Sequence, residues 1–187
     1  MKKQNECEIQ EKPKLVTLLI ASLIIATVSA QVYYSLSVTS TISVASTDVY
    51  FMPGTDSTSA GASMGSADNT TITFTNLKAY PGVTTTYSQA AIVRNNASAA
   101  SYQVRMRPVS LTGAATNFVF VNFTLVEGST TKASLNYTSD TSTWTIPSAT
   151  SFTSITADTN WSLVVETMAI EGAASDSVDI VLTIDVQ

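Results

Sequence analysis

The chain has 187 residues, no histidine, one cysteine and a formal net charge of −5 at pH 7. A His-Glu-x-x-His zinc site and a Ser-His or Cys-His catalytic relay both need histidine, so the usual protease chemistries are excluded. The acidic balance disfavours nucleic acid as a partner, because phosphate backbones are bound by a surplus of lysine and arginine. We therefore expect a protein that is not an enzyme and that uses no cofactor or metal. The alternative is calcium bound by Asp176 and Asp179 or by Asp56 and Asp68, although the sequence has no Asp-x-Asp-x-Asp loop.

The first thirty residues predict a secretory signal peptide. A charged stretch with four lysines precedes the apolar run LVTLLIASLIIATV at 15–28, and the small-x-small sequence Val28-Ser29-Ala30 follows it. We expect cleavage between Ala30 and Gln31, which makes the protein extracellular. The alternative is a retained membrane anchor, but a helix of this run would be about 21 Å long, shorter than the roughly 30 Å hydrocarbon core of a bilayer.

Residues 31–187 make up one domain-sized segment rich in serine and threonine. This segment carries five of the nine cations and eleven of the fourteen carboxylates, and Cys7 lies ahead of it, so no disulfide supports the secreted chain. The serines and threonines alternate with Val, Ile, Phe, Leu and Tyr, which a disordered mucin-like stalk lacks. Threonine in this pattern indicates β-strands.

The first alternating run, QVYYSLSVT at 31–39, directly follows the expected cleavage position. One face of this run is apolar and consists of Val32, Tyr34, Leu36 and Val38, and Tyr33 lies on the other face. A strand at the tip of a chain can add to a sheet of a second molecule, or it can fold back into its own sheet. The pattern alone leaves both arrangements open.

Period-two alternation continues to the end of the sequence, and no segment has a helical stripe. Turn signals separate the alternating runs, and the Gly/Ser/Ala-rich stretch 53–69 is long enough that we expect a mobile loop or an interface there. The sequence therefore predicts an all-β sandwich of roughly seven to ten strands over residues 41–187. The predicted strands are an early pair of runs at 42–44 and 49–51, followed by strands at 72–74, 87–93, 102–109, 118–126, 134–137, 161–167 and 180–186.

The segment 72–109, ITFTNLKAYPGVTTTYSQAAIVRNNASAASYQVRMRPV, resembles the TasA/camelysin family of secreted filament proteins. In that family an Asn-Leu-Lys-Pro-Gly turn, a strand, Asn-Asn-Gly-Ser and a second strand follow one another. Here Ala79-Tyr80 is inserted before Pro81-Gly82, and Ala97 replaces the glycine. The lack of cysteine, the Ser/Thr-rich composition and the many sequons are most similar to the archaeal bundling pilins of the family.

The resemblance implies a jelly-roll-like sandwich with an N-terminal donor strand at 31–40. It also implies a head-to-tail homopolymer, an extracellular filament of the biofilm-matrix or pilus kind, with lateral contacts between fibres. The partner of the chain is then a second copy of itself. The alternative function is a monomeric secreted adhesion or carbohydrate-binding module, in which Trp144 or Trp161 would form the sugar-binding platform.

Two further groups of side chains are candidate sites. Arg94, Arg105 and Arg107 form a basic cluster, and we expect either solvent exposure or pairing with carboxylates of a neighbouring subunit. Asn122 lies in the apolar run FVFVNFTLV, where a glycan fits only if its strand face points to solvent. The candidate N-glycosylation sites, whose glycans would coat the fibre, are the five sequons at Asn69, Asn96, Asn122, Asn136 and Asn160.

Overall fold

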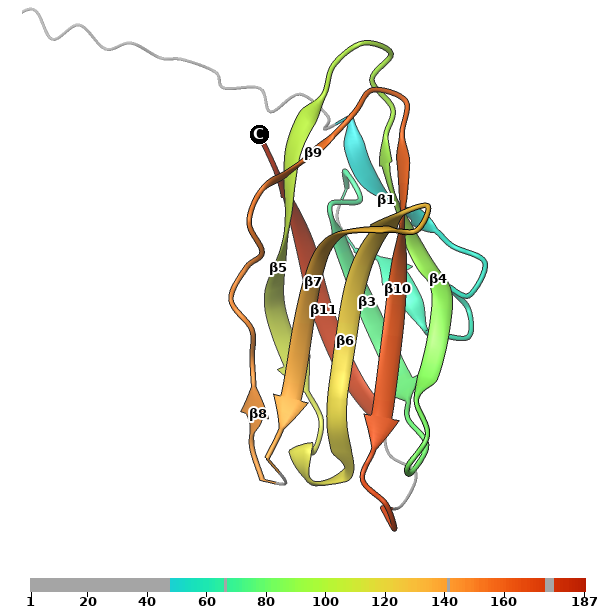
Figure 1. Ribbon diagram of the computed structural model, residues 1–187, viewed down its shortest axis with the longest axis vertical. Helices are drawn as coiled ribbons and strands as arrows, with labels where there is room; N and C mark the ends of the chain where they lie inside the picture. The colour runs from blue at the N-terminus through green and yellow to red at the C-terminus, as the bar shows by residue number, and fades with distance from the viewer. Residues whose placement is uncertain (1–47, 66, 141, 174–176) are drawn as a thin grey trace, which may run out of the picture. The chain divides into compact units, whose positions relative to one another are not determined.

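The computed structural model describes residues 48–187 except 66, 141 and 174–176 (Figure 1). These residues form an all-β sandwich without an α-helix, which confirms the predicted fold class; the single 3-10 turn is η1 (Ala115–Asn117). The described residues contain eleven strands, more than predicted, because three of them have only two or three residues and are too short to show alternation. The leader and the predicted donor strand lie outside the described residues.

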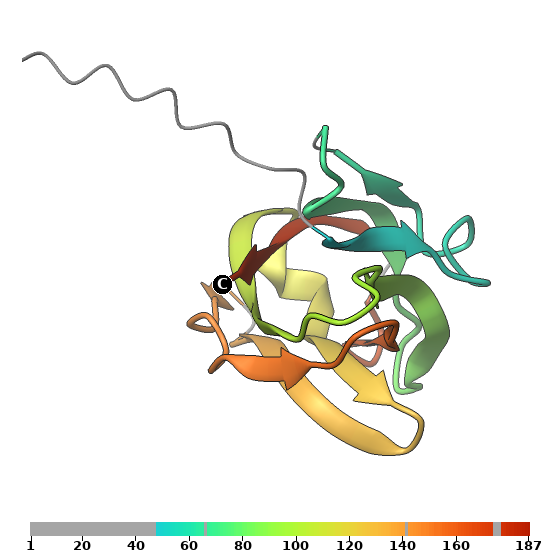
Figure 2. The same cartoon turned by 90° about the horizontal axis from the view of Figure 1, so that it is seen from above.

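Two antiparallel sheets make up the sandwich, and Figure 2 shows them from above as two facing layers. Sheet A has the strand order β1-β4-β10-β6-β7-β8, and sheet B has the order β2-β3-β11-β5-β9. Consecutive strands therefore often lie in different sheets. The strands are β1 (Val49–Pro53), β2 (Ala62–Met64), β3 (Thr71–Lys78), β4 (Thr85–Asn95), β5 (Tyr102–Thr112), β6 (Phe118–Glu127), β7 (Thr130–Ser139), β8 (Trp144–Thr145), β9 (Thr153–Ile155), β10 (Asn160–Ala169) and β11 (Ser177–Val186).

The alternation in the sequence becomes the difference between the inner and outer faces of each sheet. In β10, Trp161, Leu163 and Val165 are buried, whereas the residues between them are only partly buried. The inner faces of the two sheets meet in one core, where the ring of Phe74 in sheet B lies 5.3 Å from that of Phe123 in sheet A. The burial of Trp161 supports core packing and leaves no room for a sugar on its ring.

The segment 146–152 covers the side of the sandwich between β5 and β7 (Figure 1). The N–H of Thr150 donates to the carbonyl of Met106, and the N–H of Met106 donates to the Thr150 hydroxyl, at 2.9 and 3.0 Å. The hydroxyl of Thr153 donates to the carbonyl of Lys132 in the other sheet. The segment 146–152 and Thr153, the first residue of β9, thus close one lateral opening between the sheets.

The loop 54–61, in the stretch predicted to be mobile or at an interface, spans the opposite side of the sandwich. The N–H of Asp56 donates to the carbonyl of Gln89 in β4, and the N–H of Gln89 donates to the Asp56 carboxylate, both at 3.0 Å. At the other end of the loop, the N–H of Thr75 in β3 donates to the carbonyl of Gly61. The composition of the loop could not predict that it is ordered, because the hydrogen bonds that hold it are made with strands distant in the sequence.

A buried asparagine organises the end of the sandwich at which β4 ends. The side-chain amide of Asn95 donates to the carbonyls of Ala100, Ile155 and Thr156, and its oxygen accepts from the N–H of Ala97. Asn95 is also the register partner of Val49, the first residue of β1. The described chain therefore starts at the Asn95 end of β4.

Candidate functional site

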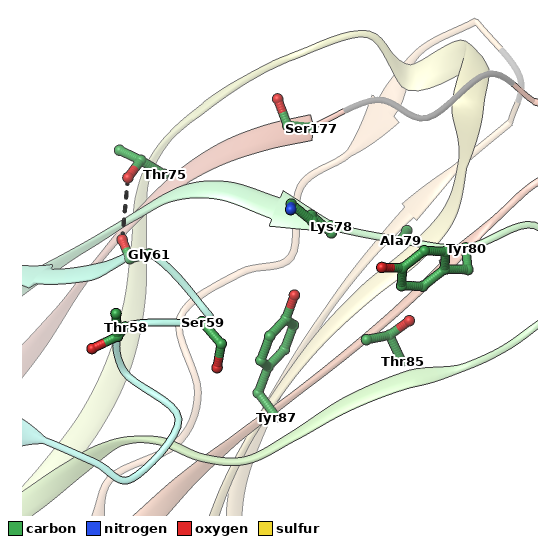
Figure 3. A pocket seen from close by; sticks show the side chains of 10 residues that line it. All are labelled: Thr58, Ser59, Gly61, Thr75, Lys78, Ala79, Tyr80, Thr85, Tyr87 and Ser177. Atoms are coloured by element: carbon green, nitrogen blue, oxygen red, sulfur yellow. Dashed lines mark hydrogen bonds between the residues drawn. The ribbon is translucent and has the colours of Figure 1, made fainter.

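A groove of ≈ 980 Å³ lies between the sheets on the side of β3 and β4 (Figure 3). Its walls come from β3, β4, the loop 54–61, the connection between β3 and β4, and the start of β11. The groove thus occupies the side of the sandwich opposite to the segment 146–152. The residues that line it are Thr58, Ser59, Gly61, Thr75, Lys78, Ala79, Tyr80, Thr85, Tyr87 and Ser177.

Two strand edges are open at this groove. β1 pairs with β4 only at residues 91–95, and β2 pairs with β3 only at residues 72–74. Among the described residues, the segments 85–88 of β4 and 76–78 of β3 therefore have no neighbouring strand on the groove side. The edge of a sheet offers backbone N–H and C=O groups with which an added strand can pair.

Both ends of the groove are bounded by chain segments. The loop 54–61 closes one end, where it bonds to Gln89 and Thr75. The connection 79–84 bounds the other end and is held by Ala169, whose N–H donates to the carbonyl of Tyr80 at 3.2 Å. Two large side chains of this connection are exposed, since Tyr80 and Val83 have 57% and 60% of their surface accessible. Tyr80 and Val83 therefore form an apolar rim of the groove at the Thr85 end of β4, which we call the lip.

The chemistry of the groove is mixed rather than apolar. The phenol of Tyr87 points into the groove toward Lys78 (Figure 3). Burial raises the pKa of Tyr87 and outweighs a backbone hydrogen bond with Lys78, which lowers it. The nearby Tyr80 raises this pKa further, so the phenol stays neutral at pH 7. The hydroxyl of Thr167 in sheet A donates to the Lys78 carbonyl in sheet B at 2.6 Å and joins the two sheets beside the groove. The hydroxyl groups of the threonine, serine and tyrosine side chains and the amino group of Lys78 can therefore form hydrogen bonds with a segment or ligand in the groove.

The residues predicted for strand donation and cleavage lie outside the described part of the chain, so their roles stay predictions. Of the groove, the sequence indicates two parts. Its loop lies within the stretch 53–69, expected to be mobile or at an interface, and the Tyr80-Pro81-Gly82 turn marks its lip. The predicted residues concerned are Ala30, Gln31, Val32, Tyr33, Tyr34, Leu36 and Val38.

Three of the five sequons lie on strands of sheet A, at Asn122, Asn136 and Asn160, and all three side chains are on the outer face. Asn69 and Asn96 are exposed and lie outside the strands. The condition for a glycan at Asn122, a strand face that points to solvent, is met. Nevertheless, its amide nitrogen donates to Glu166 and its oxygen accepts from Ser134, at 3.2 and 2.9 Å. Glycosylation stays a prediction at all five positions.

The structure separates the three arginines that the sequence suggested as one cluster. Arg94 lies in sheet A, 2.6 Å from the carboxylate of Asp158. Arg105 and Arg107 lie on one face of β5 in sheet B, and both contact Asp185 of β11, at 2.8 and 3.1 Å. Each arginine thus pairs with a carboxylate of its own chain, and a contact with a neighbouring subunit stays a prediction.

Replacing Asp185 with asparagine is expected to lower the free energy of unfolding by about 1 kcal/mol at pH 7, because two partly exposed ion pairs are lost. Burial would raise the pKa of Asp185, but the guanidiniums of Arg107 and Arg105 outweigh it and hold this pKa below the usual range. The ion pairs therefore stabilise the fold fully above the ordinary aspartate pKa of about 3.9, and this contribution is lost as the pH falls through the lowered value.

Urea unfolding of the parent and of Asp185→Asn at a series of pH values checks this expectation. The difference in unfolding free energy should be constant from neutral pH down to about pH 5 and should shrink in stronger acid. A difference that stays the same over the whole acid range would show that the Asp185 charge does not stabilise the fold.

The described residues hold no group of three or more His, Cys, Asp or Glu side chains that could bind a metal ion. Nor does the described part of the chain contain a helix of the length and apolarity needed to cross a membrane.

Comparison with known proteins gives no family assignment. No family model matches the sequence, and no curated protein is similar to it. The resemblance to the TasA/camelysin family therefore stays a prediction that rests on the segment 72–109.

Proposed function

We propose that the protein is a structural subunit of an extracellular filament and that its residues 31–39 add as a strand to the groove of the next subunit. The observation that supports this function is that, among the described residues, the segments 85–88 and 76–78 have no neighbouring strand on the side of the groove. Addition of a strand there supplies backbone hydrogen bonds and covers the gap between the sheets. Because donor and acceptor are different surfaces, the contact does not close on itself and yields an open filament.

The positions of the two surfaces on the sandwich support a head-to-tail arrangement. The described chain starts at Asp48, whose carbonyl accepts from the N–H of Asn96, next to the last residue of β4. The groove lies at the other end of β4, at Thr85 and Tyr87. β4 has eleven residues, so its ends lie about 33 Å apart at a strand rise of 3.3 Å per residue. We therefore expect the donor to leave the sandwich at one end, whereas the groove lies toward the other end.

Burial of the apolar face of residues 31–39 adds to the energy of such a contact. Burying the side chains of Val32, Tyr34, Leu36 and Val38 would contribute on the order of 6 to 10 kcal/mol before the cost of ordering the strand. Backbone pairing with β4 satisfies polar groups that a buried strand would otherwise leave without partners. The mixed lining of the groove makes the backbone contribution essential.

The lining also favours a second candidate function, a monomeric carbohydrate-binding module. Tyr80 and Tyr87 lie among several hydroxyls, and aromatic rings with convergent polar groups are typical of small-molecule sites. Neither of the two tryptophans suggested by the sequence lines this groove. Trp161 is buried, and Trp144 packs on Phe118 and donates its indole N–H to the carbonyl of Gly113.

Deletion of residues 31–39 is expected to abolish polymerisation while leaving the sandwich folded, because none of the deleted residues belongs to the described strands. Both chains are expressed with the leader, collected from the medium and examined by negative-stain microscopy and size-exclusion chromatography. A variant with Tyr33→Ser alone, on the outward face of the run, is the matched control and should still form fibres.

Fibres from the intact chain and monomers from the deletion variant are the expected result. Fibres from both would contradict the role of residues 31–39. Monomers from both would favour the carbohydrate-binding alternative, which a glycan-array measurement with the same intact protein would then examine.

A further inference from the structure

We infer that the incoming strand runs antiparallel to β4, in line with β1, and that only its N-terminal half enters the groove, with Gln31 at the loop 54–61. This inference rests on the proposed function and specifies the direction and depth of the contact. Three features of the sandwich support it: the place where the described chain starts, the edge that β1 already occupies, and the loop that closes the groove.

The direction follows from the two ends of the sandwich. The described chain begins with Asp48 at the Asn95 end of β4, so we expect the donor segment to leave its own sandwich at this end. A neighbouring subunit stacked in the same orientation presents the Thr85 end of its β4 to this donor. The part of the donor nearest to its own sandwich, Thr39, then reaches the connection 79–84 first, and Gln31 reaches furthest along β4. Because β4 itself runs from Thr85 to Asn95, the two strands run in opposite directions.

The strand β1 provides the same geometry within one subunit. It pairs with β4 in antiparallel register, from Val49 opposite Asn95 to Pro53 opposite Ala91. At Gly54 the chain turns away from this edge, and the segment 85–88 is left open. An incoming antiparallel strand would continue the line of β1 along the same edge of sheet A, after the short interruption made by Asp56.

The loop 54–61 limits how far the donor strand can extend along β4. Asp56 bonds to both the N–H and the carbonyl of Gln89, so this position of β4 is already occupied. Four residues, 85–88, remain, which correspond to about 13 Å of strand. The donor run 31–39 is longer than this edge. The N-terminal part with Val32 and Tyr34 therefore enters the groove.

The C-terminal part of the donor, with Leu36 and Val38, then lies over the lip. There Tyr80 and Val83 expose 57% and 60% of their surface. Two exposed apolar side chains next to the open edge give the second half of the donor an apolar surface to cover. This accounts for their exposure at a turn that could otherwise carry polar residues.

Cross-linking of paired cysteines tests the direction, because the chain contains no cysteine after Cys7. Matched variants combine Gln31→Cys with Ser59→Cys, and Thr39→Cys with Val83→Cys. Swapped variants combine Gln31→Cys with Val83→Cys, and Thr39→Cys with Ser59→Cys. Ser59 and Val83 are exposed and lie at the loop and lip ends of the groove. Each secreted full-length chain is examined for fibres under reducing conditions, treated with a short bismaleimide, and run on a denaturing gel.

Covalent ladders from the matched variants and only monomers from the swapped variants are the expected result. Ladders from the swapped variants would overturn the inferred direction while the fibres themselves still supported the filament. Fibres without ladders from any variant would show that the donor uses another site. An absence of fibres under reducing conditions in all four variants and in the parent would instead refute the proposed function.

Discussion

Replacing Gly61 with alanine is expected to lower the free energy of unfolding by about 3 kcal/mol, since the change combines an unfavourable backbone conformation with a clash. Gly61 has a φ of 62°, in the left-handed region, and a Cβ built on it would lie 1.9 Å from the carbonyl oxygen of Thr75. This oxygen belongs to the backbone of β3 and cannot move without disturbing sheet B. Urea unfolding of the secreted chain measures the loss.

Two other glycines separate the causes of this effect. Gly128 has a φ of 59° with nothing within 4 Å of an added Cβ, so Gly128→Ala tests the backbone conformation alone and should cost about 1 kcal/mol. Gly54 has an ordinary φ, but its Cβ would lie 1.9 Å from the carbonyl oxygen of Gln89, so Gly54→Ala tests the clash alone. Equal losses for Gly61→Ala and Gly128→Ala would show that the loop does not press against β3.

Replacing Phe123 with alanine is expected to lower the free energy of unfolding by about 4 kcal/mol, through lost burial and a cavity in the core. The ring of Phe123 is fully buried in β6 and contacts Phe74 of the other sheet and Tyr137 of β7, with ring centroids 5.3 and 5.8 Å apart. Its removal therefore weakens the packing between the sheets as well as within sheet A. A loss of this size is a large fraction of the stability of an ordinary domain.

The matched control is Phe120→Ala in the same strand. Phe120 lies on the outer face of β6 and is only partly buried, so its removal should cost about 1 kcal/mol. Urea unfolding of both variants, followed by tryptophan fluorescence because Trp161 is in the core, gives the comparison. Similar losses for the two variants would contradict the assignment of the inner and outer faces.

The long strands could be predicted from the sequence because each has one face in the core and the other outside. In β11 the apolar side chains of Val178, Ile180 and Leu182 alternate with partly or fully exposed positions, and the predicted strand at 180–186 lies within β11. The short strands β2, β8 and β9 could not be predicted, because two or three residues do not establish a period. Their positions depend on the neighbours with which they pair.

The loop 54–61 illustrates the limit of composition as a guide. Small and polar residues indicate the absence of an apolar face, and mobility is a reasonable prediction from that. In the structure the loop is ordered by backbone bonds to Gln89 and Thr75, which are more than ten positions away in the sequence. Because Gly54 and Gly61 have no side chain, the loop can lie close to the backbone of both strands. Glycine here allows close packing of the loop as well as a turn.

The sequence by itself determined the all-β class, the alternation of each long strand and the absence of histidine chemistry, since these follow from local periodicity and residue type. Only the tertiary structure decided which strands are neighbours. That choice brings Thr58, Lys78 and Tyr87 to one groove and separates Arg94 from the two arginines that share Asp185. Within the described residues, it also leaves 85–88 of β4 without a neighbouring strand on the groove side. Pairing between distant strands depends on backbone hydrogen bonds and on the packing of two sheets, and neither is encoded in any short stretch of sequence.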